Sequence, residues 1–508
     1  MRTGTSRGLT LGELATELAA FAPQLSGGDA STLVTDVDQD SRSVVPGTLF
    51  VARQGQHTDG LRFAADAQRR GAAAIMVAAD AEPPALGCPV LRVRDLPRAI
   101  GVAAEAVHRH PSDVLRLAGV TGTNGKTTVS WLLQHALDQL DLRCGRIGTL
   151  GVELAGQHHD TPLTTPEADA LSRSLAWMRD RGASHAAMEV SSVALATGRV
   201  EALRFHTAAF TNLTRDHLDF HGTFEAYRDA KARLFLELQP EVAVLNQDDE
   251  FGRWLAEHTP LTVRVIRVGS TPDCDIHGAE LMARPEGVAG SLSAFGRRLE
   301  LRTRLVGRHN AENLLVAFGV LAALGADLPR AAAVLSDVAP APGRLERCDG
   351  SDDDCVVLVD YAHTPDALER VLAALSPVRG GKLICVFGCG GQRDPGKRAP
   401  MGRAVGQGAQ WAVLTNDNPR AESPEAIAEA VEVGLRATGV RYDVVLDREL
   451  AIERAISQAE PGDVVLLAGK GHEPYQLIGT RSLPFDDREV ARAALLRRRS
   501  ARRGGSGP

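Results

Sequence analysis

The chain has 508 residues, which is too long for one hydrophobic core, so we expect two to four domains. Its hydrophobic fraction of 44% and charged fraction of 24% are those of an ordinary soluble globular protein. The net charge of -7 argues against a general nucleic-acid binder, because there is no excess positive field to hold a polyphosphate backbone.

The cysteines and the N-terminal segment indicate the compartment. Seven cysteines are scattered without a CxxC pair, which suits a reducing environment. The first residues have no apolar run followed by a cleavage site, so a signal peptide is not expected. No window approaches the roughly 20 apolar residues that span a bilayer. We therefore expect a cytoplasmic protein with no membrane partner and no nucleic-acid partner.

Strand-like apolar runs followed by helical patterns recur along the chain and predict α/β layers. The first group, 1–112, contains the runs "GTLFVARQG", "AAAIMVAA" and "PVLRVRD". The second, 113–342, begins with "VLRLAGVTG" and continues through "SHAAMEVSS", "FHTAAFTNLT" and "EVAVLNQDDE". The third, 343–490, follows the Pro/Gly-rich stretch "APAPGRLER", which is interpreted as a linker, and contains "CVVLVDYAH", "GKLICVFGCGG", "QWAVLTNDNPR" and "GDVVLLAGKGHE". The basic, glycine-containing end, 491–508, is expected to be a disordered tail.

The ends of these runs predict where ligands bind. Nearly every strand of the second and third groups ends in a polar residue or glycine. Ligands of open parallel sheets bind beyond the carboxyl ends of the strands. Two nucleotide-fold domains are therefore expected to present their loops to ligands.

The segment "TGTNGKTT" is a phosphate-binding loop between a buried strand and a helix. Gly122 and Gly125 let backbone N–H groups close around phosphate oxygens, and the helix from Lys126 adds its N-terminal dipole. Lys126 would reach the β- and γ-phosphates, and Thr127 would place its hydroxyl on Mg²⁺. The alternative is a glycine-rich turn with an incidental lysine. Val120 stands where the usual pattern has its first glycine.

Later segments narrow the chemistry. Glu189 ends a strand and is positioned to bind Mg²⁺ directly or through water. His217 and Lys231 follow in "TNLTRDHLDFHGTFEAYRDAKARLF", although either one alone would suit a packing or solvated position.

The motifs "GTNGKTT", "EVSS", "TNLTRDHLDFHG…YRDAK" and "GRHNAEN" occur in this order, and the chain resembles the Mur ligase family over nearly its whole length. These are ATP-dependent amino-acid-adding enzymes of peptidoglycan precursor synthesis. The resemblance implies three domains: a small α/β N-terminal domain, a central P-loop parallel-sheet domain and a C-terminal Rossmann-like domain. The family's loop also lacks the first Walker glycine.

The resemblance also implies the ATP and metal residues. Lys126, Glu189, His217 and Lys231 would be catalytic, with Lys231 carbamylated by CO₂. Thr127, Glu189, His217 and the Lys231 carbamate would hold two Mg²⁺ ions. The ions would neutralise charge during phosphoryl transfer. The expected ATP contacts are Gly122, Thr123, Asn124, Gly125, Lys126, Thr127, Thr128, Asn310, Asn313, Arg344 and Asp360.

The first domain carries "DQDSRSVVPGTLFVARQGQHTDG", which resembles the uridine-nucleotide signature of the tripeptide-forming branch; the alternative is a polar β-turn beside a strand. The branch usually reads EVSSH and has glutamine at a later position, where this chain has Val193 and Thr197. These departures predict altered substrate contacts with the metal-site glutamate intact. The expected contacts to UDP-N-acetylmuramoyl-L-alanyl-D-glutamate are Gln39, Ser41, Gln56, His57, Thr58, Thr164, Thr165, Ser191, Thr197 and Arg199.

The third domain indicates the amino acid. Arginine forks bind carboxylates bidentately, whereas a carboxylate suits an ammonium, and meso-2,6-diaminopimelate has both groups at its distal end. In the family "DNPR" marks diaminopimelate enzymes; by itself it would be an Asx-Pro turn with a surface arginine. The expected diaminopimelate contacts are Arg393, Asp417, Asn418, Pro419, Arg420, Gly469 and Glu473.

The resemblance therefore implies a monomeric ligase that activates the D-glutamyl carboxylate as an acyl phosphate and transfers it to the diaminopimelate amine. The alternatives are the same chemistry with L-lysine or another diamino acid, and a degenerate relative that only binds precursor. A folylpolyglutamate synthetase would leave the uridine signature without a role. A nucleotide switch or motor would not need "DNPR" or the lysine of "YRDAK".

Overall fold

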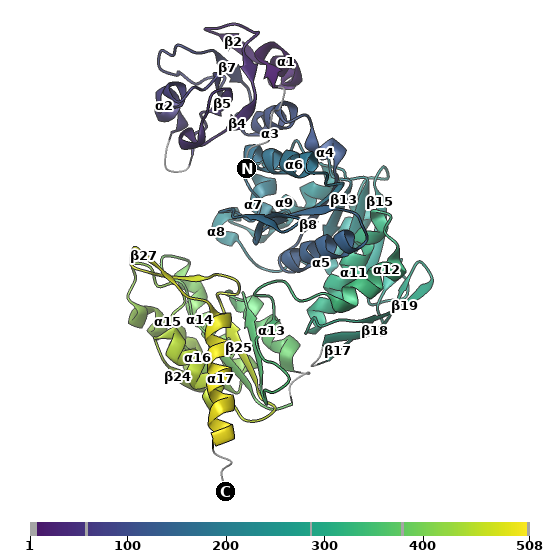
Figure 1. Ribbon diagram of the computed structural model, residues 1–508, viewed down its shortest axis with the longest axis vertical. Helices are drawn as coiled ribbons and strands as arrows, with labels where there is room; N and C mark the ends of the chain where they lie inside the picture. Colours follow the sequence, from purple (N-terminus) through teal and green to yellow (C-terminus); the bar gives the residue numbers. More distant parts are fainter. Residues whose placement is uncertain (1–7, 56–58, 285–286, 377–379, 505–508) are drawn as a thin grey trace. The chain divides into compact units, whose positions relative to one another are not determined.

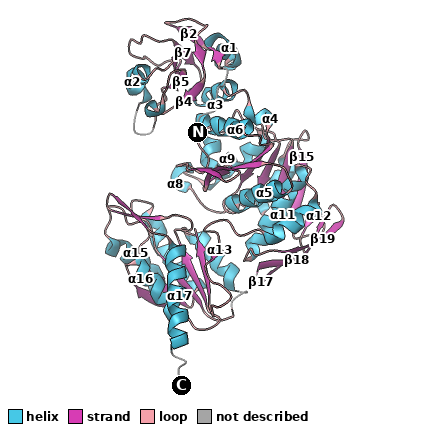
Figure 2. Cartoon of the chain, in the orientation of Figure 1, coloured by secondary structure: helices cyan, strands magenta, loops and turns pink. Residues whose placement is uncertain are grey.

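The computed structural model describes residues 8–55, 59–284, 287–376 and 380–504 (Figures 1 and 2). The chain divides into two compact units. The first comprises Met1–Leu213, Phe220–Ile276 and Leu315–Val334, and the second comprises Thr214–Asp219, His277–Leu314 and Leu335–Pro508. Among the described residues, no helix has both the length and the apolarity needed to cross a bilayer.

The N-terminal part of the first unit is a five-stranded sheet in the order β2-β7-β6-β5-β4, in which only the β2–β7 pair is antiparallel. Buried residues cover both faces, with Leu49 and Met76 on one side and Phe50 and Ile75 on the other. The elements are β1 (Leu9–Thr10), α1 (Leu11–Glu17), β2 (Gln24–Ser26), β3 (Leu33–Val34), β4 (Asp36–Asp38), β5 (Thr48–Val51), α2 (Ala64–Arg69), β6 (Ala74–Ala78), β7 (Val90–Val93), α3 (Leu96–Val107) and α4 (Pro111–Val114).

The rest of the first unit is built on a sheet in the order β11-β10-β9-β12-β8-β13-β14-β15. Strands β9, β12, β8, β13, β14 and β15 are parallel, so their carboxyl ends share one edge. The elements are β8 (Arg116–Thr121), α5 (Lys126–Gln139), β9 (Cys144–Gly148), β10 (Gly151–Leu154), β11 (Gln157–His159), α6 (Ala168–Asp180), β12 (His185–Glu189), α7 (Ser192–Ala196), β13 (Thr207–Phe210), α8 (Leu218–His221), α9 (Phe224–Leu236), β14 (Val242–Asn246), α10 (Glu250–His258), β15 (Arg264–Gly269) and β16 (Ile276–His277).

The second unit contains a six-stranded sheet in the order β20-β21-β25-β22-β23-β24, parallel except at β20. Helices α13, α14 and α15 pack on one face, and α16 and α17 pack on the other. The elements are β17 (Met282–Arg284), β18 (Gly287–Ala294), β19 (Arg297–Arg302), β20 (Glu346–Arg347), β21 (Val356–Asp360), α13 (Pro365–Leu375), β22 (Leu383–Phe387), α14 (Arg398–Gly408), β23 (Trp411–Leu414), α15 (Pro424–Arg436), β24 (Arg441–Val444), α16 (Arg448–Gln458), β25 (Val464–Ala468), β26 (Tyr475–Ile478), β27 (Arg481–Pro484) and α17 (Asp487–Gly504). The unit boundaries pass through α8, β16, α11 (Arg308–Ala323) and α12 (Leu328–Asp337), so each of these elements has residues in both units.

Local sequence explains where several helices begin. Thr364 and Ser423 each accept a hydrogen bond from a backbone N–H in the first turn of α13 and α15, and a proline follows each cap. The apolar runs quoted above all form strands, from β5 to β25, so the predicted α/β class is confirmed.

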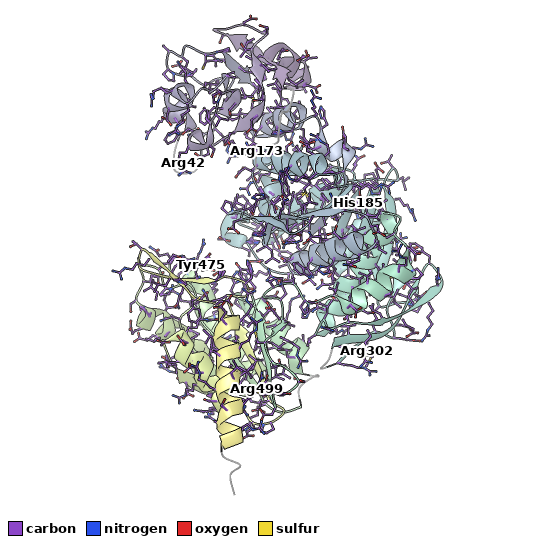
Figure 3. All side chains as sticks on the ribbon, in the orientation of Figure 1. Arg42, Arg173, His185, Arg302, Tyr475 and Arg499 are labelled. Atoms are coloured by element: carbon purple, nitrogen blue, oxygen red, sulfur yellow. The ribbon has the colours of Figure 1, made fainter. Side chains whose placement is uncertain are left out.

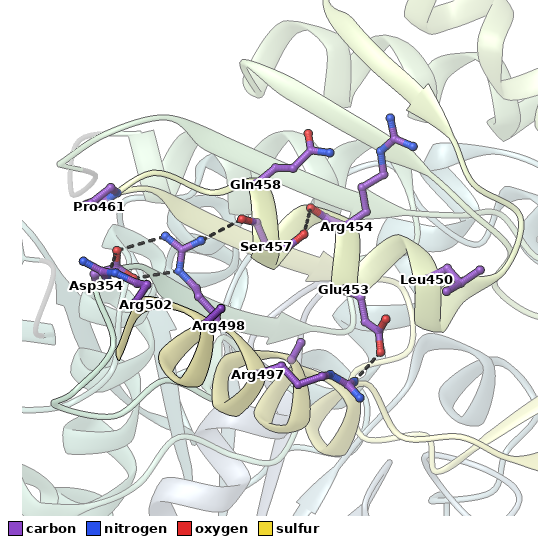
Figure 4. A pocket seen from close by; sticks show the side chains of 12 residues that line it. Asp354, Leu450, Glu453, Arg454, Ser457, Gln458, Pro461, Arg497, Arg498 and Arg502 are labelled. Atoms are coloured by element: carbon purple, nitrogen blue, oxygen red, sulfur yellow. Dashed lines mark hydrogen bonds and ion pairs between the residues drawn. The ribbon is translucent and has the colours of Figure 1, made fainter. Parts of the chain in front are cut away.

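The expected disordered tail is wrong for residues up to Gly504, which continue α17. The guanidinium of Arg498 donates to both carboxylate oxygens of Asp354 at 2.9 and 3.1 Å (Figure 4). It also donates to the carbonyl oxygen of Ile456 at 2.9 Å. Arg499, labelled in Figure 3, pairs with Asp353. These arginines therefore attach the helix to the loop before β21 and to α16, rather than lying solvated.

Candidate functional site

The phosphate loop joins β8 to α5, as predicted. Gly122 has φ +150° and Gly125 has φ +90°. A Cβ at Gly122 would overlap the Thr211 hydroxyl, so the loop needs glycine for close approach as well as for its backbone angle. The Asn212 side chain accepts from Asn124 N–H at 3.0 Å, which fixes the loop against β13.

Two lysine side chains meet at one carbonyl of this loop. Lys126 Nζ donates to the carbonyl oxygens of Gly122 at 2.8 Å and Thr123 at 2.9 Å. Lys231 Nζ, from α9, donates to the same Gly122 oxygen at 2.9 Å. Lys231 is 1% exposed, and its ammonium lies 4.6 Å from the centre of the Tyr227 ring. Two cations beside a glycine loop and a helix N-terminus form a site complementary to a polyphosphate.

A set of oxygen-bearing side chains surrounds Glu189 at the end of β12. The Thr127 hydroxyl donates to Oε2 at 2.9 Å, and Thr149 N–H donates to Oε1 at 2.8 Å. The Thr165 hydroxyl donates to the Glu189 carbonyl at 2.8 Å and accepts from Ser191 N–H at 3.0 Å. Thr164 lies in hydrogen-bond contact with Thr149, and Thr128 is buried nearby on α5. The structure thus brings together the predicted residues of the loop, β12 and the "LTTPEA" segment.

His217 lies in the other unit, within Thr214–Asp219. It has φ +52°, and its ring lies 3.6 Å from the Asp216 carboxylate. Among the described residues, no three His, Cys, Asp or Glu side chains are gathered in a metal-binding arrangement. A metal role for His217 stays a prediction.

The predicted uridine-side residues are tied to a cluster of buried charges. The Gln39 side chain donates to Asp169 Oδ1 at 2.7 Å, and Ser41 is buried in the first turn of a short 3₁₀ helix. Arg173 (Figure 3) contacts Asp36 at 3.0 Å and Asp38 at 3.1 Å, and lies 3.9 Å from Asp169. Gln56, His57 and Thr58 lie outside the described residues.

Burial raises the pKa of Asp38 to about 6, against the opposing effect of Arg173. The neighbouring Asp36 has a lowered pKa even though burial acts in the other direction, because His108 and Arg173 together favour its ionised form. The cluster therefore combines a carboxylate whose ionised form is favoured, Asp36, with one whose pKa is raised to about 6, Asp38.

Of the two unusual positions after "EVSS", Val193 lies on α7 and Thr197 caps its C-terminal end. Thr197 donates its hydroxyl to the Val193 carbonyl at 2.8 Å, so here it ends the helix. Arg199 donates to the Thr165 carbonyl at 3.1 Å and pairs with Glu167 at 2.9 Å. Burial lowers the pKa of Arg199.

The second unit contains the expected base-side residues. Asn310 donates to the Val306 carbonyl at 2.8 Å and accepts from Asn313 at 3.0 Å, and both asparagines are buried. The Arg344 guanidinium lies 4.7 Å from the Tyr361 ring centre. Asp360, at the end of β21, accepts hydrogen bonds from the backbone N–H groups of Leu345 and Ala362, and burial raises its pKa.

The predicted amino-acid residues gather at the ends of β23 and β25. Asn418 donates to Glu473 Oε2 at 3.1 Å, and the backbone of Gly469, with φ +117°, runs beside Asp417. Arg420 has φ +55° and donates to the Gly391 carbonyl at 2.8 Å, and the Pro419 carbonyl lies against the same glycine. Arg393 is exposed in the loop after β22.

Sequence reasoning missed two residues, Lys470 in this cluster and Tyr227 beside the phosphate loop. Lys470 is fully buried with its ammonium near Asp417, Asn418 and Glu473, although a lysine between glycines suggests a solvated loop. Tyr227, whose hydroxyl lies 2.9 Å from the Thr123 hydroxyl, is the other. Its position one helical turn before Lys231 was the available signal.

Comparison with known proteins matches three family models to the chain. They are the Mur ligase family catalytic domain over residues 34–108, the Mur ligase middle domain over 120–321, and the Mur ligase glutamate ligase domain over 343–471. The matches fall within the three predicted domains, whose boundaries stay a prediction.

Individual relatives are similar over most of their length. The UDP-N-acetylmuramoyl-L-alanyl-D-glutamate–2,6-diaminopimelate ligase of Gloeobacter violaceus is 45% identical over 92% of this chain and 95% of its own. A solved structure described by the same enzyme name is 33% identical, with a TM-score of 0.69 over 96% of this chain and 99% of its own. MurF ligase from Thermotoga maritima in complex with ADP shares the fold at 17% identity, with a TM-score of 0.61 over 92% of this chain and 99% of its own.

Proposed function

The chain belongs to the Mur ligase family, and we propose that it joins meso-2,6-diaminopimelate to UDP-N-acetylmuramoyl-L-alanyl-D-glutamate with hydrolysis of ATP to ADP and phosphate. The observation that carries the choice of amino acid is the cluster of Asp417, Asn418 and Glu473. Its first two members lie in the same segment as Arg420. Carboxylates suit the distal ammonium of diaminopimelate, and an arginine fork suits its distal carboxylate. L-Lysine has no distal carboxylate for that arginine.

The nucleotide is proposed to bind at the loop of residues 121–128. Lys126 now donates to two loop carbonyls, so it would exchange those bonds for phosphate oxygens when ATP arrives. Asn310, Asn313, Arg344 and Asp360 are proposed to contact the nucleoside end. Their side chains are polar or charged, and the pairing of Asn310 with Asn313 fixes the direction of one amide.

The donor set around Glu189 suits magnesium. A carboxylate and the hydroxyl of Thr127 are oxygen ligands of the kind that Mg²⁺ prefers. We propose that Glu189, Thr127 and His217 hold magnesium, which would neutralise charge on the phosphates. The present contact of Lys231 does not suit the carbamate found in the family. Its ammonium donates a hydrogen bond to the Gly122 carbonyl, whereas a carbamate oxygen can only accept one. Carbamylation would therefore replace that bond.

The reaction follows from substrate positioning. An oxygen of the D-glutamyl side-chain carboxylate attacks the γ-phosphorus, the bond to the β-phosphate oxygen breaks, and ADP leaves. The neutral amine of diaminopimelate then attacks the acyl carbon, loses a proton, and displaces phosphate. Lys126 stabilises negative charge on the transferred group. The contacts of this chain orient the reactants, so no covalent enzyme intermediate is required.

The precursor is proposed to contact Gln39, Ser41, Thr164, Thr165, Ser191, Thr197 and Arg199.

We further propose a cytoplasmic monomer. The seven cysteines are free and buried, which suits a reducing compartment.

An ADP-release assay tests the function. We expect release only when UDP-N-acetylmuramoyl-L-alanyl-D-glutamate and meso-diaminopimelate are both present, with a product heavier by one diaminopimelate less one water. L-Lysine should substitute poorly. ADP release that needs neither substrate would reject a ligase, and equal rates with lysine would reject the proposed acceptor.

A further inference from the structure

Lys470 lies behind the proposed amino-acid site in the second unit. Its side chain is 0% exposed. Its ammonium lies 3.2 Å from Asn418 Oδ1, 3.6 Å from Glu473 Oε2 and 3.7 Å from Asp417 Oδ1. The Tyr475 ring, 5.7 Å away, forms another part of its surroundings. One buried cation thus contacts three residues of the same proposed site.

The charges of this cluster do not cancel. Asp417 and Glu473 supply two carboxylates, and Lys470 supplies one ammonium. The nearby Arg448 does not change the balance, because Asp487 pairs with it at 2.6 Å and both side chains are 0% exposed. Asp417 Oδ1 is buried and accepts no hydrogen bond from the described residues. Arg420 donates to the carbonyls of Gly391 at 2.8 Å and Asn418 at 3.4 Å, and its charge is assigned above to the substrate carboxylate. The two carboxylates and Lys470 therefore leave one negative charge for a ligand cation.

Lys470 also sets the direction of the Asn418 amide. Asn418 Oδ1 accepts from Lys470 Nζ and, at 2.9 Å, from Leu477 N–H. Because both donors face the oxygen, the amide nitrogen must face Glu473, to which it donates at 3.1 Å. The Glu473 carboxylate is held on one side by this amide.

We propose that Lys470 is a positioning and specificity-determining residue, which orients Asn418 and Glu473 and leaves the cluster with the single negative charge that accepts one ammonium of the amino-acid substrate. This inference rests on the proposed function. It assigns no contact between Lys470 and the reacting atoms.

The ionisation of the cluster agrees with this role. Burial lowers the pKa of Lys470 and raises that of Glu473, so burial disfavours the charged form of each. Their mutual attraction opposes both effects. Removing the ammonium would leave Asp417 and Glu473 to repel each other, and their ionisation would move to higher pH.

The test compares Lys470→Met, Lys470→Gln and Lys470→Arg with wild type in the ADP-release assay over pH. For Met and Gln we expect the KM for diaminopimelate to rise about tenfold or more, with the KM values for ATP and the precursor within about twofold. The acid limb of the diaminopimelate kcat/KM profile should move up by about one pH unit. In Lys470→Arg the acid limb should return toward its wild-type position, because the arginine restores the positive charge. Lys470→Gln keeps a hydrogen-bond donor for Asn418, so it still tests the inference if Lys470→Met does not fold.

Lys382→Met is the matched control, because Lys382 is half-exposed, lies in the same unit and pairs with Glu460. It should leave all three KM values unchanged. An unchanged diaminopimelate KM or an unmoved acid limb in Lys470→Gln overturns the inference, and so does an equal rise in all three KM values. Wild type that prefers lysine rejects only the proposed acceptor, and the same comparison is then made with lysine. Wild type with no amino-acid dependence overturns both.

Discussion

The hydroxyl of Thr127 donates to the carboxylate of Glu189 across 2.9 Å, joining the first turn of α5 to the end of β12. The two residues are 62 positions apart in the chain, yet β8 and β12 are adjacent parallel strands. A hydroxyl at a phosphate loop and a carboxylate on the neighbouring strand are the oxygen donors expected beside a nucleotide-bound Mg²⁺.

Glu189→Gln keeps the side-chain shape and the contact with Thr149 but removes the charge. We expect kcat to fall at least about a hundredfold, because charge on the transferred phosphate would be less well neutralised. The half-saturating Mg²⁺ concentration should rise, while the melting temperature changes little. Steady-state kinetics with a magnesium titration measures both effects. An unchanged kcat would contradict the assignment of Glu189.

Lys231→Arg tests the carbamate. Wild type incubated with ¹³C-bicarbonate should show a carbamate carbon resonance that the arginine variant lacks, because a guanidinium does not form this adduct at neutral pH. The variant keeps a cation that can donate to Gly122, so the loop should stay folded. The same resonance in both proteins would place the modification elsewhere.

Arg420→Lys keeps the charge of the proposed carboxylate-binding arginine but loses its fork. We expect the KM for diaminopimelate to rise about 10- to 100-fold, as for loss of a charge-assisted bidentate bond, and Arg420→Ala to be at least as severe. The KM for ATP should not change. Arg436→Ala, which changes an exposed arginine of the same unit paired with Glu432, is the control. Unaltered diaminopimelate kinetics in Arg420→Ala would reject the assignment.

Asp38→Asn should change how stability depends on pH. Burial raises the pKa of Asp38 to about 6, so the folded protein holds this proton more tightly than the unfolded chain does. The stability contributed by the protonated form is full below pH ~4 and is lost as pH rises through about 6. The melting temperature of the variant relative to wild type should therefore increase from pH 4 to pH 6 and then level off.

Asp141→Asn, at a carboxylate that is 92% exposed, is the comparison and should show no such trend. The charged groups around Asp38 are Asp36, Asp169 and Arg173, and His108 contacts Asp36. All four are present in both the Asp38→Asn and the Asp141→Asn variant. A difference in melting temperature that is constant with pH would contradict the raised pKa.

Much of the architecture was predictable, because the buried strands are continuous apolar runs that end in polar residues. The phosphate loop was equally plain, since its glycines, lysine and threonine adjoin a strand and a helix. Lys470 was not predictable in this way, because its surroundings come from β26, in which Tyr475 lies near the ammonium and Leu477 N–H is hydrogen-bonded to Asn418. Local sequence shows only a lysine between two glycines.

The prediction of a disordered tail for the C-terminal arginines was wrong for a related reason. A run of basic residues suggests a solvated tail when no acidic partner is nearby in sequence. The partner of Arg498, Asp354, is 144 positions away. The pairing arises only because α17 crosses the sheet beside α16, with Ala491 and Leu495 in the apolar layer.

That helix has a practical consequence for handling the protein. A fusion or truncation placed before Gly504 would unpair Asp353 and Asp354 and uncover part of the sheet face that α16 and α17 share. Affinity labels and deletion boundaries at this end should therefore be chosen beyond the last helical turn, or a defect in yield could be mistaken for a defect in chemistry.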